Sequence, residues 1–188
     1  MNKMTMMGVW LIALFSTGCN QDLVEYNSND LKISIEKGEK WLHKFPLFLG
    51  INKKNPPQIA IWTEDMKGHY LSTVYVTHKI ATQSWQFSGG NRRKEALPHW
   101  CYQRGVESED GLYLPTKKSP LVDGITGATP QGSFQVKMVP TGKQKQFIVK
   151  VEINHSADFN EAFPKSAKEG DANYTGGKEG SGQPALVY

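Results

Sequence analysis

The stretch that decides the fold is QIAIWTEDMKGHYLSTVYVT, residues 58–77. Its two arms, 58–63 and 70–77, show a period of two and are rich in β-branched and aromatic side chains, which is typical of β-strands. Between the arms, Gly68 can adopt the positive φ that tight turns require. The stretch therefore predicts an antiparallel β-hairpin.

Other segments of the chain repeat this strand pattern. The clearest are residues 32–36, 133–139 and 146–153, and residues 184–188 are expected to form a last short strand. Because a Pro-Thr-Gly-Lys turn at 140–143 separates two of them, 133–139 and 146–153 are predicted to form a second hairpin.

Helical patterns are nearly absent. One short helix is predicted around residues 92–97, ended by Pro98, and residues 155–183 are predicted to be a long irregular segment because Gly, Asn, Ser, Asp and Lys dominate there. We therefore expect an all-β fold. The hairpins favour a single immunoglobulin-like antiparallel β-sandwich with long irregular loops over residues 31–188.

Composition excludes several classes. A chain of 188 residues with 38% hydrophobic and 11% aromatic residues is too apolar to be disordered. Its net charge of +4 is small and spread out, so we expect no nucleic-acid partner. Two cysteines cannot form a disulfide framework or a thiolate metal centre, and no metal site is predicted.

The N-terminus has the features of an export signal. Lys3 precedes the apolar run Met6–Phe15, which is too short to span a bilayer, and small residues then lead to Cys19. This arrangement resembles the lipobox of bacterial lipoproteins, although Ser16 stands where a large aliphatic residue is usual. It implies a signal peptide over 1–18, lipidation at Cys19 and a polar tether over 19–30. The alternative is a plain secreted protein that is cleaved nearby.

One heptapeptide carries the main functional hypothesis: Asp123-Gly124-Ile125-Thr126-Gly127-Ala128-Thr129. It resembles the motif that periplasmic FMN transferases recognise in FMN-binding subunits of sodium-pumping quinone reductases and related electron-transport complexes. The resemblance implies that Thr129 carries covalent FMN through a phosphodiester. The matching recognition residues are Asp123, Gly124, Thr126, Gly127 and Ala128.

The residue types suit that chemistry. A threonine hydroxyl is a poor nucleophile at neutral pH, so an external enzyme has to activate it, and the acceptor segment has to be exposed and extended or turn-like. Gly124 and Gly127 are expected to supply a flexible backbone, while Ala128 leaves the approach to Thr129 uncrowded. The alternative is a glycine-rich β-turn between two strands, with no cofactor.

A wider resemblance points the same way. Residues 57–76, LPHW (97–100), DGITGAT and residues 150–161 are similar to a family of uncharacterised bacterial periplasmic proteins associated with flavin transferases and membrane redox partners. The better-known FMN-binding domain is mixed α/β, so an α+β FMN-binding domain is the alternative fold.

Other candidates are weaker. The loop Ser88–Lys94 could bind phosphate, and Trp85 with Trp100 are the preferred pair for stacking on a flavin ring, although tryptophans in a β-fold, Trp62 included, are more often core. Cys101 is expected to be a buried hydrophobe that His99 cannot activate. A polar group near the end of the strand 146–153 is expected to face solvent: Glu152, His155, Asp158, Asn160 and Glu161.

Together these features predict an exported, periplasm-facing membrane lipoprotein with FMN on Thr129. It would relay electrons as a carrier rather than act as a stand-alone enzyme. The expected partners are a periplasmic FMN transferase, a membrane redox protein and, through the lipid anchor, the membrane. The alternative is a non-catalytic immunoglobulin-like binding or structural lipoprotein without a cofactor.

Overall fold

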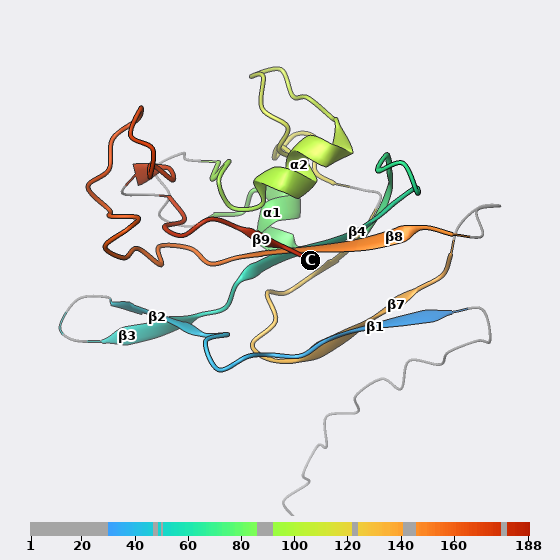
Figure 1. Ribbon diagram of the computed structural model, residues 1–188, viewed down its shortest axis with the longest axis horizontal. Coiled ribbons are helices and arrows are strands. Elements are labelled where there is room, and N and C mark those ends of the chain that lie inside the picture. The colour runs from blue at the N-terminus through green and yellow to red at the C-terminus, as the bar shows by residue number, and fades with distance from the viewer. Residues whose placement is uncertain are drawn as a thin grey trace, which may run out of the picture.

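The computed structural model describes residues 30–46, 49, 51–85, 92–121, 124–140, 146–177 and 180–188 (Figure 1). Residues 1–29, which include Cys19, lie outside the described residues, so the predicted signal peptide, lipidation site and tether remain predictions. Asp30, the last residue of the predicted tether, forms an ion pair with Lys137 (2.7 Å). In chain order the elements are β1 (Leu31–Ile35), β2 (His43–Pro46), β3 (Asn52–Asn55), β4 (Gln58–Glu64), β5 (Tyr70–Thr77), α1 (His78–Thr82), α2 (Pro98–Arg104), β6 (Ile125–Gly127), β7 (Phe134–Met138), β8 (Ile148–Asn154) and β9 (Leu186–Val187).

The main sheet has the strand order β6-β5-β4-β8-β9. Strands β4 and β5 form the predicted hairpin, and β8 and β9 extend the sheet in antiparallel fashion beyond β4. The short strand β6 pairs with β5 in parallel at the other edge. Two further antiparallel pairs, β1 with β7 and β2 with β3, complete the described strands. The predicted all-β class is confirmed.

Two apolar clusters lie on opposite faces of the main sheet. Ala60 and Trp62 of β4 belong to the cluster that includes residues of α1 and α2, whereas Ile59 and Ile61 belong to the cluster that includes residues of β1 and β7. Figure 1 accordingly shows the helices on one side of the sheet and the β1–β7 pair on the other. This alternation follows from the period of two along a strand that is covered on both faces.

The second predicted hairpin is wrong. Strand β7 pairs with β1, and β8 pairs with β4, so the two segments lie in different sheets. Val136 and Met138 of β7 are buried in the cluster below the main sheet, and this burial requires β7 to cross away from β8. A turn sequence at 140–143 does not by itself specify which strands pair.

The helix predicted over 92–97 is also misplaced. Helix α2 begins at Pro98, the residue that was expected to end it, because a proline in the first turn needs no N–H and has a suitable φ. Helix α1, directly after β5, was not predicted; it is only one turn long and buries Ile80 and Ala81. The irregular structure predicted for 155–183 is confirmed in its described residues, and a strand forms at Leu186–Val187 as expected.

Glu152 is fully buried, contrary to the prediction that it faces solvent. Its strand β8 lies inside the sheet, between β4 and β9, and α2 covers this face. The Glu152 carboxylate accepts hydrogen bonds from the backbone N–H groups of His99 (3.1 Å) and Trp100 (2.7 Å), which satisfies two amides in the first turn of α2. Burial raises the pKa of Glu152 to about 7, and the two hydrogen bonds oppose this shift.

This burial makes stability depend on pH. Because the folded protein holds the Glu152 proton more tightly than the unfolded chain, whose carboxyl has the ordinary pKa of 4.5, the contribution of this group to the free energy of unfolding falls as pH rises from about 4.5 to about 7. We expect Glu152→Gln to remove that part of the slope, measured by urea denaturation at a series of pH values. Glu161→Gln, at an exposed position, is the matched control. An unchanged slope in Glu152→Gln would show that the carboxyl does not titrate in this range.

Candidate functional site

The middle of the heptapeptide forms an edge strand of the main sheet. Ile125–Gly127 is strand β6, which pairs in parallel with Tyr75–Thr77 of β5, and the side chains of Ile125, Thr126 and Ala128 are exposed. Asp123 lies outside the described residues. The segment is therefore extended and accessible, as the transferase hypothesis requires, and it is not the β-turn of the alternative interpretation.

The glycines serve close approach rather than the flexibility expected from the sequence. A Cβ on Gly127 would lie 2.9 Å from Cε2 of Tyr75, and a Cβ on Gly124 would lie 2.8 Å from Cγ2 of Thr73. Both contacts are shorter than real Cβ atoms tolerate, so only glycine lets the segment pack this tightly against β5.

The carbonyl groups on either side of Thr129 are both held by buried aromatic residues. The Tyr75 hydroxyl donates to the Ala128 carbonyl oxygen (3.1 Å), and the Trp41 indole N–H donates to the Pro130 carbonyl oxygen (3.0 Å). Burial raises the pKa of Tyr75 to about 12, so its hydroxyl remains a neutral donor at physiological pH. The side chain of Thr129 is partly exposed and forms no hydrogen bond within the described residues.

Sequence reasoning missed Trp41. It lies just before β2, outside every motif that we recognised, and its contact with Pro130 spans 89 residues. Its only sequence signal is that a large aromatic residue with one N–H donor usually finds a partner when it is buried.

The charge near this edge is positive. Helix α1 follows β5 without a linker and carries Lys79 on its exposed side. Partial desolvation lowers the pKa of Lys79, and the nearby positive charges of Lys53 and Arg93 lower it further. Within the described part of the chain, no carboxylate forms an ion pair with Lys53 or Lys79.

The tryptophans proposed for ring stacking are already engaged. Trp100 is fully buried and donates to the Thr73 hydroxyl (3.1 Å), so its proposed contact with a flavin is wrong and its core role is confirmed, as it is for Trp62. Trp85 is half-buried, and the Arg93 guanidinium lies 5.0 Å from the centre of its ring.

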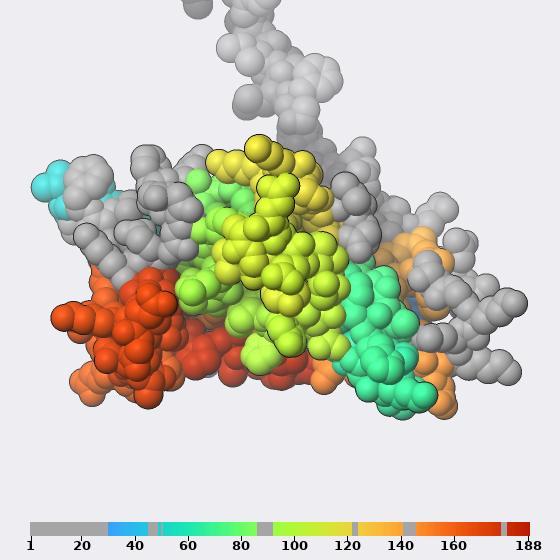
Figure 2. Space-filling view, turned by 90° about the horizontal axis from the view of Figure 1, so that it is seen from above, coloured from blue at the N-terminus to red at the C-terminus, as the bar shows by residue number. Residues whose placement is uncertain are grey.

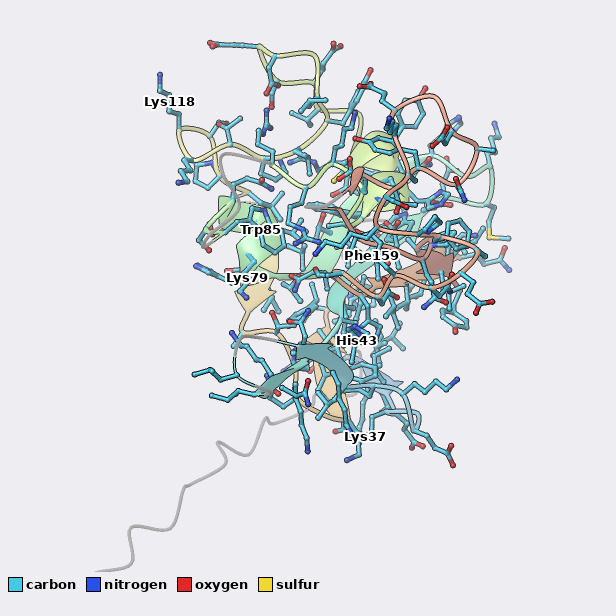
Figure 3. All side chains as sticks on the ribbon, turned by 90° about the vertical axis from the view of Figure 1, so that its left-hand side faces the viewer. Lys37, His43, Lys79, Trp85, Lys118 and Phe159 are labelled. Atoms are coloured by element: carbon cyan, nitrogen blue, oxygen red, sulfur yellow. The ribbon has the colours of Figure 1, made fainter. Side chains whose placement is uncertain are left out.

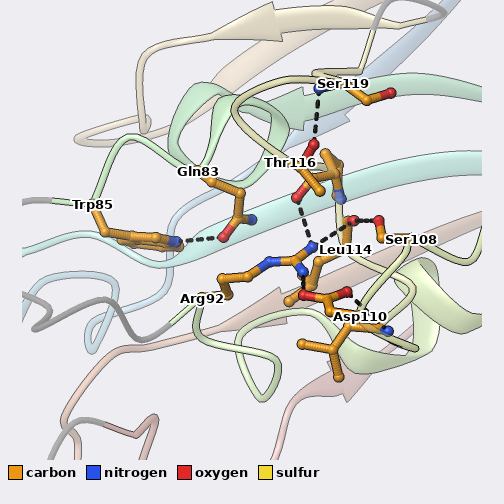
Figure 4. A network of polar contacts seen from close by, with 10 residues as sticks. Gln83, Trp85, Arg92, Ser108, Asp110, Leu114, Thr116 and Ser119 are labelled. Carbon is orange, nitrogen blue, oxygen red and sulfur yellow. Dashed lines mark hydrogen bonds and ion pairs between the residues drawn. The ribbon is translucent and has the colours of Figure 1, made fainter.

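The basic loop is partly described. Ser88–Asn91 lie outside the described residues, whereas Arg92 forms an ion pair with Asp110 and donates to the carbonyl oxygens of Leu114 (2.9 Å) and Pro115 (3.1 Å) (Figure 4). Arg92 thus fastens two surface loops together. Arg93 donates to the Gly180 carbonyl oxygen (3.1 Å) and stacks on Trp85, so both arginines have protein partners.

The polar group after β8 is dispersed. Asp158 is buried, contrary to the expectation that it faces solvent, because its side chain accepts a hydrogen bond from the backbone N–H of Gln183 (3.0 Å). His155 lies near His43, with 6.1 Å between ring centroids. Among the described residues, no three His, Cys, Asp or Glu side chains are grouped so that they could hold a metal ion. Cys101 is buried, as predicted, and burial raises the pKa of its thiol to about 12.

A cavity of about 410 Å³ lies at the other end of the hairpin. Figure 2 shows α2 and the loop after it at the centre of the helix-covered face, beside the β4–β5 turn. Residues of β4, β8, β9, α2 and the turn line the cavity: Trp62, Glu64, Gly68, Pro98, His99, Tyr102, Gln103, Lys150 and Val187. Because β6 pairs with the end of β5 that is remote from this turn, the cavity and Thr129 are separate features.

Comparisons with family models, curated proteins and solved structures found no match to this chain. In the part of the chain that the structure describes, neither helix has the length and apolar character needed to cross a membrane.

The packing at Gly127 is testable. We expect Gly127→Ala to lower the free energy of unfolding by about 1–3 kcal/mol, because its methyl group would overpack against the Tyr75 ring. Gly38→Ala is the control, since a Cβ at that position meets nothing within 4 Å. Urea denaturation of the two variants measures the difference. Equal stabilities would contradict the close approach of β6 to β5.

Proposed function

We propose that this protein is an exported, lipid-anchored flavoprotein that carries FMN on Thr129 through a phosphodiester and relays electrons outside the cytoplasm. The observation that carries the proposal is the setting of Thr129. Residues 125–127 of the motif form an exposed edge strand, and the carbonyl groups of Ala128 and Pro130 are held by Tyr75 and Trp41. The Thr129 hydroxyl has no protein partner in the described structure.

The residues around Thr129 fit an FMN group attached through a phosphodiester. A partly exposed hydroxyl provides the attachment atom, the exposed Ala128 leaves room beside it, and the nearby cations suit the negative charge of a phosphodiester. When bound, FMN would supply one- and two-electron redox chemistry, which side chains cannot provide. The role of the chain is to hold the attachment point and to set its electrostatic surroundings.

Attachment requires an activated donor. The Thr129 oxygen would attack the phosphorus of a flavin nucleotide in which that phosphate is part of a pyrophosphate, as in a flavin dinucleotide. The new Thr129 O–P bond forms as the pyrophosphate O–P bond breaks. The nucleoside monophosphate leaves with the electron pair, and the threonine proton passes to a base on the transferase. No base among the described residues hydrogen-bonds the Thr129 hydroxyl, which agrees with the need for a separate FMN transferase.

The remaining parts of the proposal come from the sequence. Lipidation at Cys19 would keep the carrier near a membrane redox protein and raise the effective concentration of the two partners. A tether of about a dozen residues would allow the domain to move between electron donor and acceptor.

A second candidate function rests on the cavity beside α2. The Tyr102 phenol and the Lys150 ammonium group line this concave site and suit a small polar ligand, whereas the Trp62 indole and the Glu64 carboxylate are hydrogen-bonded to each other. The site favours the alternative of a binding lipoprotein without a cofactor. Under that alternative Thr129 has no role, so the two functions are separated by a substitution at Thr129.

We expect the full-length protein, coexpressed with a periplasmic flavin transferase, to gain the mass of one FMN less one water. The band should fluoresce under ultraviolet light on a denaturing gel. Thr129→Val should abolish both signals because it removes the hydroxyl, whereas Thr129→Ser, which keeps a hydroxyl, should retain modification.

Two controls complete this experiment. A known acceptor protein shows that the transferase is active, and urea denaturation shows that Thr129→Val remains folded. Unmodified wild-type protein beside a modified control acceptor would rule out the flavin proposal and favour ligand binding at the cavity.

A further inference from the structure

We propose that Lys53 and Lys79 form an anion-binding site beside Thr129 and that this site holds the phosphodiester of the attached flavin. The inference rests on the proposed function and adds to it the residues that receive the phosphate.

The parallel pairing of β5 and β6 places Lys79 near Thr129. Thr77 is the register partner of Gly127, and both strands run in the same direction, so the chain leaves the sheet at the same end after each of them. Lys79 lies two residues beyond Thr77, and Thr129 lies two residues beyond Gly127. Helix α1 contacts β6, so the segments that follow β5 and β6 stay close to each other.

The β2–β3 hairpin places Lys53 at the same end of the main sheet. Lys53 is five residues before Gln58, whose side chain accepts a hydrogen bond from Thr77 at the end of β5. Trp41, which binds the Pro130 carbonyl group, is two residues before β2, and Lys53 of β3 pairs with Phe45 of β2. In Figure 3, Lys79 and this hairpin lie on the same side of the molecule. The electrostatic effect of Lys53 on Lys79 agrees with their proximity.

The charge at this place lacks a counter-ion within the described structure. Lys53 and Lys79 are exposed, have no carboxylate partner among the described residues, and repel each other. The Arg93 guanidinium, also close to Lys79, already contacts Gly180 and Trp85. A phosphate group between the two ammonium groups would replace this repulsion with attraction.

Lysine footprinting tests the site directly. Full-length protein, loaded with flavin by the transferase or left unloaded, is treated with an acetylating reagent, and the modification of each lysine is measured by mass spectrometry. We expect loading to reduce the acetylation of Lys53 and Lys79 at least threefold, because a bound phosphate shields each amine and raises its pKa. Lys118, on the exposed loop between α2 and β6 and labelled in Figure 3, should be unchanged.

Four outcomes are distinguishable. Loading with protection of Lys53 and Lys79 alone supports the site. Loading without that protection overturns the site, because the phosphate then lies elsewhere. Equal protection in Thr129→Val protein treated with the same transferase also overturns it, because a free anion is then responsible. Absence of loading beside a modified control acceptor overturns the proposed function itself.

Charge variants give an independent readout. We expect the double variant Lys53→Gln/Lys79→Gln to load flavin several-fold more slowly than wild type, measured by intact mass over time, because the anionic donor loses an attractive site beside the acceptor hydroxyl. Lys118→Gln should load at the wild-type rate. Equal rates in all three proteins would contradict the proposal.

Discussion

The structure depends on the burial of strand β4 from both sides. All seven residues of Gln58–Glu64 are buried, and their alternating side chains enter two different cores. Such burial requires that polar groups on the strand find partners inside the protein. Gln58 accepts a hydrogen bond from the Thr77 hydroxyl (2.8 Å), and Glu64 accepts one from the Trp62 indole (2.7 Å). Both hydrogen bonds join residues of the β4–β5 hairpin, so the hairpin itself supplies partners for the polar side chains at the two ends of β4.

This hairpin also determines where the candidate site lies. Because β5 must pair with β4 along most of its length, only its other edge is available, and its last three residues receive β6 there. A segment that follows a long surface loop can approach this edge closely if it has no Cβ at the contact, and Gly127 meets that requirement. The same strand supplies Tyr75, which holds the Ala128 carbonyl group. The position of the sheet edge next to Thr129 therefore follows from the way the β4–β5 hairpin packs in the core.

The sequence predicted those features of the fold that are determined by residues close together in the chain. The β4–β5 hairpin, the other main strands, the irregular C-terminal segment and the buried Cys101 follow from periodicity, turn residues and hydrophobicity. The pairing of β7 with β1 does not, because it joins residues about 100 positions apart and the turn after β7 suggested a nearer partner. Glu152 was misplaced for a similar reason: a carboxylate on a strand is usually exposed, and only the distant helix α2 supplies the two N–H groups that allow its burial.

In the candidate site, too, the local motif could be predicted from the sequence and the long-range contacts could not. The heptapeptide is visible in the sequence, whereas Trp41 and Tyr75 contact this segment only through tertiary structure. Lys53 and Lys79, which we propose as the anion site, also come from distant parts of the chain. Under the proposed function this arrangement would matter, because electron transfer depends steeply on distance. A cofactor tied to a flexible loop would sample many distances from its partners, but an attachment residue whose neighbouring carbonyls are both held by buried aromatic side chains starts from one position. The tether proposed at the N-terminus would then supply the motion between partners, and the sheet edge would supply the fixed geometry within the carrier.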